Sequence, residues 1–231
     1  MQAKELRFQA TRSSGDVSAL LVRPDDACCL LILGHGAGAG MRHAFMESIC
    51  ERLAERGIAT FRYQFPYMEQ GRKRPDHRNI LLKTIRSTVA AATEAAAGLP
   101  LFAGGKSMGG RMTSMAAAKE ALPGVQGLVF FGFPLHPAGK PGTERGEHLA
   151  EVDVPMLFLQ GTRDKLAGLD LLRPICQGLG ERATLHIVEG GDHSFHVLKR
   201  SGRTHGEVLD ELADTTQDWI SQRVAAKQRR R

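Results

Sequence analysis

The sequence predicts an α/β protein in three layers, with a mainly parallel sheet of about eight strands covered by helices on both faces. Short apolar runs, several of them nearly continuous in Leu, Ile, Val and Phe, alternate with segments of helical periodicity. This alternation is typical of buried parallel strands joined by helices. Two segments, Glu5–Thr11 and Ser18–Arg23, are separated by Ser-Ser-Gly-Asp and indicate an antiparallel hairpin ahead of the series. A length of 231 residues fits one domain of this kind.

The remaining elements follow in order along the chain. The apolar runs that predict strands are Cys28–Leu33, Ile58–Phe61, Leu99–Ala103, Val125–Phe131, Met156–Leu159 and Ala183–Val188. The periodic segments that predict helices are Phe45–Arg56, Arg78–Ala97, Ser107–Ala121 and Val208–Val224. Gly57 fits the C-terminal cap of the first helix. The Gly- and Pro-rich segment Pro134–Asp153 is too short for a helical lid domain, so we expect an open or lightly covered site.

The positive charge of the chain is concentrated at its C-terminus. Of the formal net charge of +6, four positive charges come from Lys227 and Arg229–Arg231. We therefore expect a single domain over residues 1–226 and a solvated basic tail over residues 227–231. Aromatic residues make up only 6% of the chain, which leaves few rings to stack on bases. We expect a small-molecule partner and no nucleic acid.

The cysteines and the apolar runs indicate the compartment. Cys28, Cys29, Cys50 and Cys176 have no metal-binding spacing, and we interpret them as reduced, mostly buried thiols. The N-terminal segment lacks the apolar core of a signal peptide, and no apolar run approaches the roughly 18 residues of a membrane span. The sequence therefore predicts a cytoplasmic protein without membrane contact.

A glycine-flanked serine follows the predicted strand Leu99–Ala103. Gly105, Ser107 and Gly109 form a Gly-x-Ser-x-Gly motif at the turn from this strand into a helix. A serine at such a corner has a strained backbone, and glycines two residues before and after it avoid a steric clash. The amide of Met108 would then lie at the helix N-terminus, where it can donate to an oxyanion.

Two other interpretations of this turn are open from the motif alone. The serine fits an ordinary N-cap. The ending Gly105-Lys106-Ser107 also fits a phosphate-binding loop, but that motif requires a glycine five residues earlier, where this chain has Pro100.

A second glycine-rich loop follows the strand Cys28–Leu33. Glycine occupies every second position from residue 34 to residue 40, so backbone amides can approach a ligand. Ala37 or Gly36 would be the second oxyanion donor. We interpret His35, in the same loop, as a structural hydrogen-bonding residue and not as a base.

Acidic and basic candidates follow two later strands. Asp164 comes shortly after Met156–Leu159, and His193 comes after Ala183–Val188. Because ligands bind beyond the carboxyl ends of parallel strands, we expect both to meet Ser107 there. An imidazole can take the proton of a serine hydroxyl while a carboxylate fixes its tautomer. Asp170 and His196 are reserve candidates.

The order Ser, Asp, His is that of α/β-hydrolases, and further stretches extend the resemblance. They are Gly34–Gly38, Phe65–Arg74, Gly105–Arg111, Gln160–Asp164 and Gly190–Phe195. With them the chain resembles hydrolases related to dienelactone hydrolase, and more closely the KANL/Tex-type hydrolase-like family. The resemblance implies an α/β-hydrolase fold without a large lid domain, and places nucleophile, acid and base on Ser107, Asp164 and His193. Dienelactone hydrolases proper use a cysteine nucleophile, so the serine argues against that activity.

We therefore expect a serine hydrolase that cleaves an ester or thioester of a small to medium acyl substrate, without a metal or organic cofactor. The alternative is a non-catalytic interaction module that keeps the hydrolase fold. Apolar residues that follow strands either line an acyl pocket or pack within loops: Met41, Phe65–Met68, Phe133–Leu135 and Phe195. The cluster Arg72–Arg74 either attracts an acidic substrate or forms a solvated loop.

Overall fold

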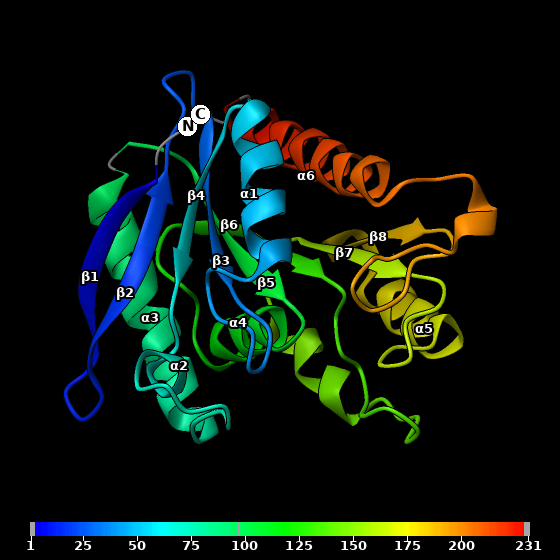
Figure 1. The fold of residues 1–231 in the computed structure, drawn as a ribbon, viewed down its shortest axis with the longest axis horizontal. Coiled ribbons are helices and arrows are strands. Elements are labelled where there is room, and N and C mark those ends of the chain that lie inside the picture. Colours follow the sequence, from blue (N-terminus) through cyan, green and yellow to red (C-terminus); the bar gives the residue numbers. More distant parts are fainter. Residues whose placement is uncertain (1–2, 97, 229–231) are drawn as a thin grey trace.

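The computed structural model describes residues 3–96 and 98–228, and it confirms the three-layer α/β prediction (Figure 1). One sheet holds eight strands in the order β1-β2-β4-β3-β5-β6-β7-β8. The pairs β1–β2 and β2–β4 are antiparallel and every other pair is parallel. The strands are β1 Lys4–Thr11, β2 Gly15–Val22, β3 Cys29–Gly34, β4 Ile58–Tyr63, β5 Leu101–Lys106, β6 Val125–Phe131, β7 Met156–Gly161 and β8 Ala183–Val188.

Helices cover both faces of this sheet. On one face α1 and α6 lie side by side, and on the other lie α3, α4 and α5 (Figure 1). The helices are α1 Ala44–Glu55, α2 Pro66–Glu69, α3 Arg78–Ala95, α4 Met108–Lys119, α5 Leu169–Leu179 and α6 His205–Gln228, with short 3₁₀ helices η1 Glu144–Glu151, η2 Gly180–Arg182 and η3 Lys199–Ser201. No helix in the described part of the chain is long and apolar enough to cross a membrane.

The continuous apolar strands follow from burial on both faces. In β3, Leu30 and Ile32 pack with the side chains of α3 and α4, while Leu31 and Leu33 pack with those of α1 and α6. Successive side chains of a strand point to opposite faces, so a strand between two helical layers must be apolar at every position.

Two local differences from the predicted elements have physical causes, while the segment predicted to lack a lid domain agrees with the structure. The strand predicted over Leu99–Ala103 runs instead from Leu101 to Lys106, because Gly104 and Gly105 still pair with the end of β3. The helix α5 was not predicted, since its interior contains Pro174. The segment Pro134–Asp153 contains only η1, and no separate lid domain stands within residues 3–96 and 98–228.

The end of α1, the C-terminal residues and the cysteines can also be compared with their predictions. Gly57 has φ 70° directly after the C-cap of α1, as predicted. Of the predicted basic tail, Lys227 lies exposed within α6, and residues 229–231 lie outside the described residues. All four cysteines are free, and three of them are buried, whereas Cys28 is exposed.

Candidate active site

Ser107 stands at the corner between β5 and α4 in a strained conformation. Its φ is 50° and its ψ is −116°, a region that a residue with a side chain rarely adopts. Such strain costs about 1–3 kcal/mol and is found at functional sites. The backbone N–H of Ser107 donates to the carbonyl of Phe131 at the end of β6. The turn at Ser107 is therefore held in place by the neighbouring strand β6.

The glycines of the motif allow β3 to approach the turn at Ser107 closely. A Cβ at Gly105 would lie 2.2 Å from the carbonyl oxygen of Gly34, and a Cβ at Gly109 would lie 2.1 Å from the same oxygen. The steric reason for both glycines is thus confirmed, but the atom they avoid belongs to β3. Gly34, Gly105 and Gly109 together let two strands and a helix meet behind Ser107.

Three side chains from the ends of three strands form a continuous hydrogen-bonded chain. The hydroxyl of Ser107 donates to Nε2 of His193 over 2.8 Å, and Nδ1–H of His193 donates to Oδ2 of Asp164 over 2.7 Å. Ser107 follows β5, Asp164 follows β7 and His193 follows β8. The structure therefore brings together the three residues that the sequence singles out. The reserve candidates lie elsewhere: Asp170 is exposed on α5, and the exposed ring of His196 stacks on His205.

The buried carboxylate of Asp164 is fixed by further donors. Its side chain has no exposed surface. Nε2 of Gln160 donates to Oδ2 over 2.5 Å, and the backbone N–H of Leu166 donates to Oδ1 over 2.8 Å. Gln160 in turn accepts from the N–H of Phe133 through its side-chain oxygen. Sequence reasoning missed Gln160, although a glutamine within a wholly buried strand is a signal that it hydrogen-bonds in the interior.

The loop that carries His193 is held by Lys106, which the sequence did not single out either. Its Nζ donates to the backbone carbonyl of His193 over 2.6 Å. Burial lowers the pKa of the Lys106 ammonium to about 8. Phe195, in a left-handed conformation with φ 63°, is fully buried against Phe45 in the core. An ammonium and an aromatic anchor thus hold the two sides of the histidine loop.

The glycine-rich loop after β3 lies next to the serine. A Cβ at Gly36 would lie 3.8 Å from Cβ of Ser107, and Ala37, Ser107 and Met108 line one cavity. Within the described residues, neither the N–H of Ala37 nor that of Met108 has an acceptor. Both predicted donors are therefore free to bind an oxygen atom at this cavity. The N–H of Gly38, by contrast, donates to the hydroxyl of Tyr67.

His35 fixes the base of this loop, which confirms its predicted structural role. Its Nδ1–H donates to the carbonyl of Gly36 over 2.7 Å, and its Nε2 accepts from the N–H of Phe65 over 3.2 Å. Burial lowers the pKa of His35 to about 4, so the ring is neutral at pH 7. Only a neutral ring can donate at one nitrogen and accept at the other.

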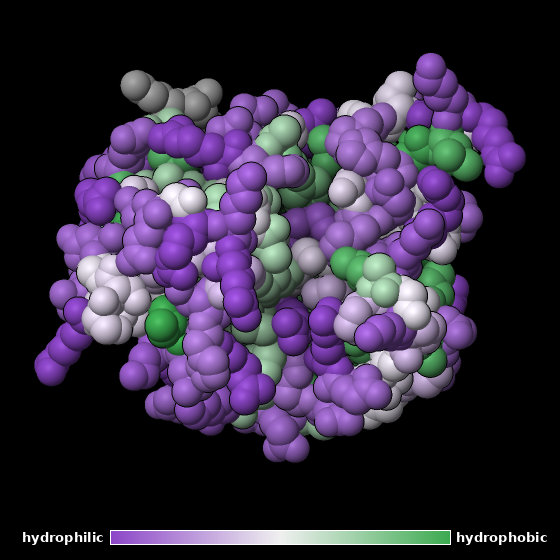
Figure 2. Space-filling model, turned by 60° about the horizontal axis from the view of Figure 1, so that its bottom comes forward, coloured by the Kyte–Doolittle hydropathy of each residue, from purple (hydrophilic) through white to green (hydrophobic). Residues whose placement is uncertain are grey.

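The cavity beside Ser107 has a volume of about 410 Å³ and an apolar floor formed by Leu81, Met108, Met112 and Met115. Of the apolar residues for which the sequence leaves an acyl pocket or loop packing open, only Pro134 lines this cavity within the described chain. The others pack elsewhere, and Phe65, Tyr67, Phe133 and Phe195 are buried in the core. Figure 2, which brings the bottom of Figure 1 forward, shows a largely hydrophilic surface with small, separate hydrophobic patches.

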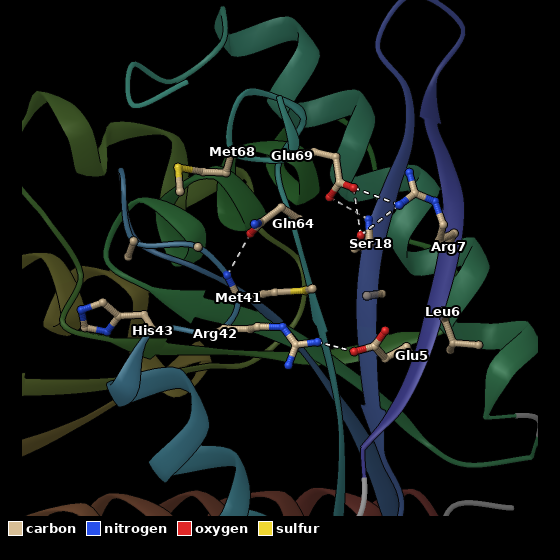
Figure 3. A pocket seen from close by; sticks show the side chains of 13 residues that line it. Glu5, Leu6, Arg7, Ser18, Met41, Arg42, His43, Gln64, Met68 and Glu69 are labelled. Carbon is tan, nitrogen blue, oxygen red and sulfur yellow. Dashed lines mark hydrogen bonds and ion pairs between the residues drawn. The ribbon is translucent and has the colours of Figure 1, made fainter. Parts of the chain in front are cut away.

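A second cavity, of about 720 Å³, lies between the β1–β2 hairpin and the loop before α1 (Figure 3). We call it the hairpin cavity. Ser107 does not line it, and its charged groups bind one another: Arg7 pairs with Glu69 over 3.0 Å, and Arg42 pairs with Glu5. In Figure 3 these pairs span the cavity wall. The hydrogen-bonded chain at Ser107 therefore belongs to the smaller cavity.

The chain resembles known proteins over most of its length. A family model described as an alpha/beta hydrolase domain matches residues 27–221. Among solved structures, a dienelactone hydrolase from Anabaena variabilis is 20% identical, with a TM-score of 0.74, over 96% of this chain and 99% of that one. XC6422 from Xanthomonas campestris, described as an α/β serine hydrolase without a lid, is 19% identical with a TM-score of 0.72 over 95% of each chain. The esterase domain of a Rhodothermus marinus protein is 16% identical, with a TM-score of 0.69, over 95% of this chain and 98% of that one. At these low identities, the TM-scores establish a shared fold.

Proposed function

The chain belongs to the alpha/beta hydrolase family and is a hydrolase, and we propose that it cleaves an ester or thioester of a small to medium acyl substrate through a covalent intermediate on Ser107. The observation that carries the proposal is the hydrogen-bonded chain from Ser107 through His193 to Asp164. A serine hydroxyl attacks a carbonyl only when a base takes its proton. Here His193 is that base, and Asp164 orients its ring.

The proposed reaction has two halves. Oγ of Ser107 bonds to the carbonyl carbon while its proton moves to Nε2 of His193. The amides of Ala37 and Met108 donate to the oxyanion that forms, and a donor of this kind typically contributes about 10²–10³ in rate. The C–O or C–S bond then breaks, and His193 gives its proton to the leaving alcohol or thiol. Water, deprotonated by His193, releases the acid and restores the Ser107 hydroxyl.

Asp164 and its partners act on the tautomer of His193. A carboxylate on Nδ1–H leaves Nε2 as the acceptor that faces Ser107, and it stabilises the imidazolium that forms. Because Gln160 and the N–H of Leu166 hold both carboxylate oxygens, Asp164 has one orientation. The free cysteines support a reducing compartment such as the cytoplasm as the place where the enzyme works.

A fluorophosphonate probe tests this proposal. Wild-type protein should gain one phosphonyl group, located on Ser107 by peptide mass spectrometry, and Ser107→Ala should gain none. Thr162→Ser, a hydroxyl change outside the hydrogen-bonded chain, is the matched control and should label like the wild type. A folded wild-type protein that is not labelled would favour the alternative, an interaction module with a hydrolase fold.

A further inference from the structure

The cavity beside Ser107 is lined by arginines from three different elements. Arg78 lies in the first turn of α3, Arg111 lies in α4 and Arg145 lies in η1. Asp76 is the one carboxylate among the lining residues that the structure describes. Three helical segments that are far apart in sequence therefore place positive charge around the same cavity.

These three guanidinium groups have no anionic partner in the described part of the protein. No carboxylate oxygen of residues 3–96 and 98–228 forms an ion pair with Arg78, Arg111 or Arg145 within 4.0 Å. Asp76 pairs with Arg72 through Oδ1 over 2.6 Å, and its buried Oδ2 has no hydrogen-bond partner among the described residues. One carboxylate therefore faces three cavity arginines, and it is already paired with a fourth arginine.

Arg111 and Arg145 are half-buried, whereas Arg78 is exposed. Arg111 also has an unpartnered donor. Its Nε atom has no exposed surface and no acceptor among the described residues. Burial, followed by the charges of Arg145 and Arg78, lowers the pKa of Arg111 to about 10. A buried cation beside two like charges is unfavourable without a counter-charge. A bound anion would supply that counter-charge.

One of the arginines lies one helical turn from Ser107, and all three line the same cavity as Ser107. The backbone N–H of Arg111 donates to the carbonyl of Ser107 over 3.1 Å, so the two residues are one helical turn (about 5.4 Å of rise) apart. Met112 and Met115 lie on the same cavity wall. The lining of the cavity thus combines a nucleophile, apolar side chains and guanidinium groups.

The hairpin cavity holds its arginines in a different arrangement. Two arginines line that larger cavity, and each has a glutamate partner. The cavity at Ser107 differs because its cations have been left without one.

We infer that the substrate is an ester or thioester that carries an acidic group, a carboxylate or a phosphate, bound by Arg78, Arg111 and Arg145 while its scissile carbonyl lies at Ser107. Guanidinium groups suit this role because their paired N–H donors match the oxygens of either anion. The inference rests on the proposed function, since Ser107 provides the reacting oxygen.

Two esters of equal chain length test the inference on the wild-type enzyme. The para-nitrophenyl monoester of glutaric acid ends in a carboxylate, and para-nitrophenyl pentanoate ends in a methyl group. The glutarate ester should have a kcat/KM at least tenfold higher, and raising the salt concentration should reduce that preference because exposed charges are screened. Equal rates, or a preference for pentanoate, would overturn the inference and leave the proposed function intact.

Variants then assign the preference to the arginines. Arg111→Gln should reduce the ratio of the two kcat/KM values about tenfold to hundredfold, mainly through KM of the glutarate ester, because a hydrogen bond between charged groups is lost. Arg145→Gln should act in the same direction and keeps the test open if Arg111→Gln does not fold. Arg173→Gln removes a charge from the exposed side of α5 and is the matched control, with an unchanged ratio. An unchanged ratio in both cavity variants would contradict the inference.

A binding measurement separates failure of the inference from failure of the proposed function. In folded Ser107→Ala, which needs no turnover, calorimetry should detect monomethyl glutarate more readily than methyl pentanoate. Inorganic phosphate that competes better than glutarate would assign a phosphate group, and the reverse order would assign a carboxylate. If the anion and the neutral ester bind alike, the inference is wrong, whatever the fluorophosphonate probe does at Ser107.

Discussion

The buried ring of His35 makes stability depend on pH in a direction that the structure fixes. The ring is fully buried, and burial lowers its pKa from an ordinary 6.5 to about 4. The folded protein therefore excludes a proton that the unfolded chain accepts below pH 6.5. The contribution of His35 to stability is complete above pH 6.5 and is lost as the pH falls toward 4.

The magnitude follows from the difference between the two pKa values. At about 1.36 kcal/mol for each pH unit, the whole contribution is about 3 kcal/mol. Roughly 2 kcal/mol of it disappears between pH 7 and pH 4.5, because the unfolded chain is then largely protonated. The physical cause is the burial of the ring, which disfavours the charged form. A protonated ring would also no longer accept the N–H of Phe65 at Nε2.

Urea unfolding of the wild type and of His35→Gln at pH 7 and pH 4.5 checks this reasoning. Glutamine keeps an acceptor for Phe65 but does not titrate, so the variant should lose about 2 kcal/mol less than the wild type over this interval. His196→Gln is the matched change at an exposed ring and should lose as much as the wild type. A His35→Gln protein with the full wild-type loss would refute the assignment of the buried neutral ring.

Three further changes test the site. Asp164→Asn should lower kcat by about 10³–10⁴ with little change in KM, because the amide favours the wrong tautomer of His193; steady-state kinetics measure this, and a change below tenfold would contradict the role of Asp164. Gly109→Ala should lower the free energy of unfolding by about 3 kcal/mol, measured by thermal unfolding, and should also lower activity, since its methyl group would lie 2.1 Å from the oxygen of Gly34. A variant with wild-type stability would show that β3 can move away from the added methyl group at little cost. Lys106→Met should lower kcat and raise stability at pH 7 by about 1–2 kcal/mol, since a buried ammonium is removed. That gain should shrink between about pH 8 and pH 10.5, where the wild-type folded state becomes neutral at Lys106 before the unfolded chain does; a gain that is constant with pH would contradict the lowered pKa.

The fold and the candidate catalytic residues can be predicted from the sequence because they depend on local patterns. Continuous apolar runs reveal strands buried on both faces, and the position directly after such a run places Ser107, Asp164 and His193 at one sheet edge. The glycines at 105 and 109 are likewise visible, although the atom they avoid, the Gly34 oxygen, is not.

The supporting residues could not be predicted, because their roles arise from contacts between distant segments. Lys106 meets the carbonyl of His193 across 87 positions of sequence. Arg111 and Arg145 reach one cavity only through the packing of η1 against α4. In sequence Arg111 is an ordinary residue of a predicted helix, and Arg145 is an ordinary residue of the Gly- and Pro-rich segment. Position after a strand also does not decide whether an apolar residue lines a pocket. Such a residue can turn inward to the core, as Phe195 does.

Pre-steady-state hydrolysis of the para-nitrophenyl monoester of glutaric acid tests the central claim, a covalent acyl-enzyme on Ser107, most directly. Rapid mixing should give a burst of nitrophenol approaching one equivalent per chain whenever deacylation is the slower step, and mass spectrometry of the quenched sample should find the glutaryl group on Ser107. Ser107→Ala should show neither burst nor adduct and should turn over at least about 10³ times more slowly. Turnover that persists in Ser107→Ala, or an acyl group located on another residue, would contradict the account.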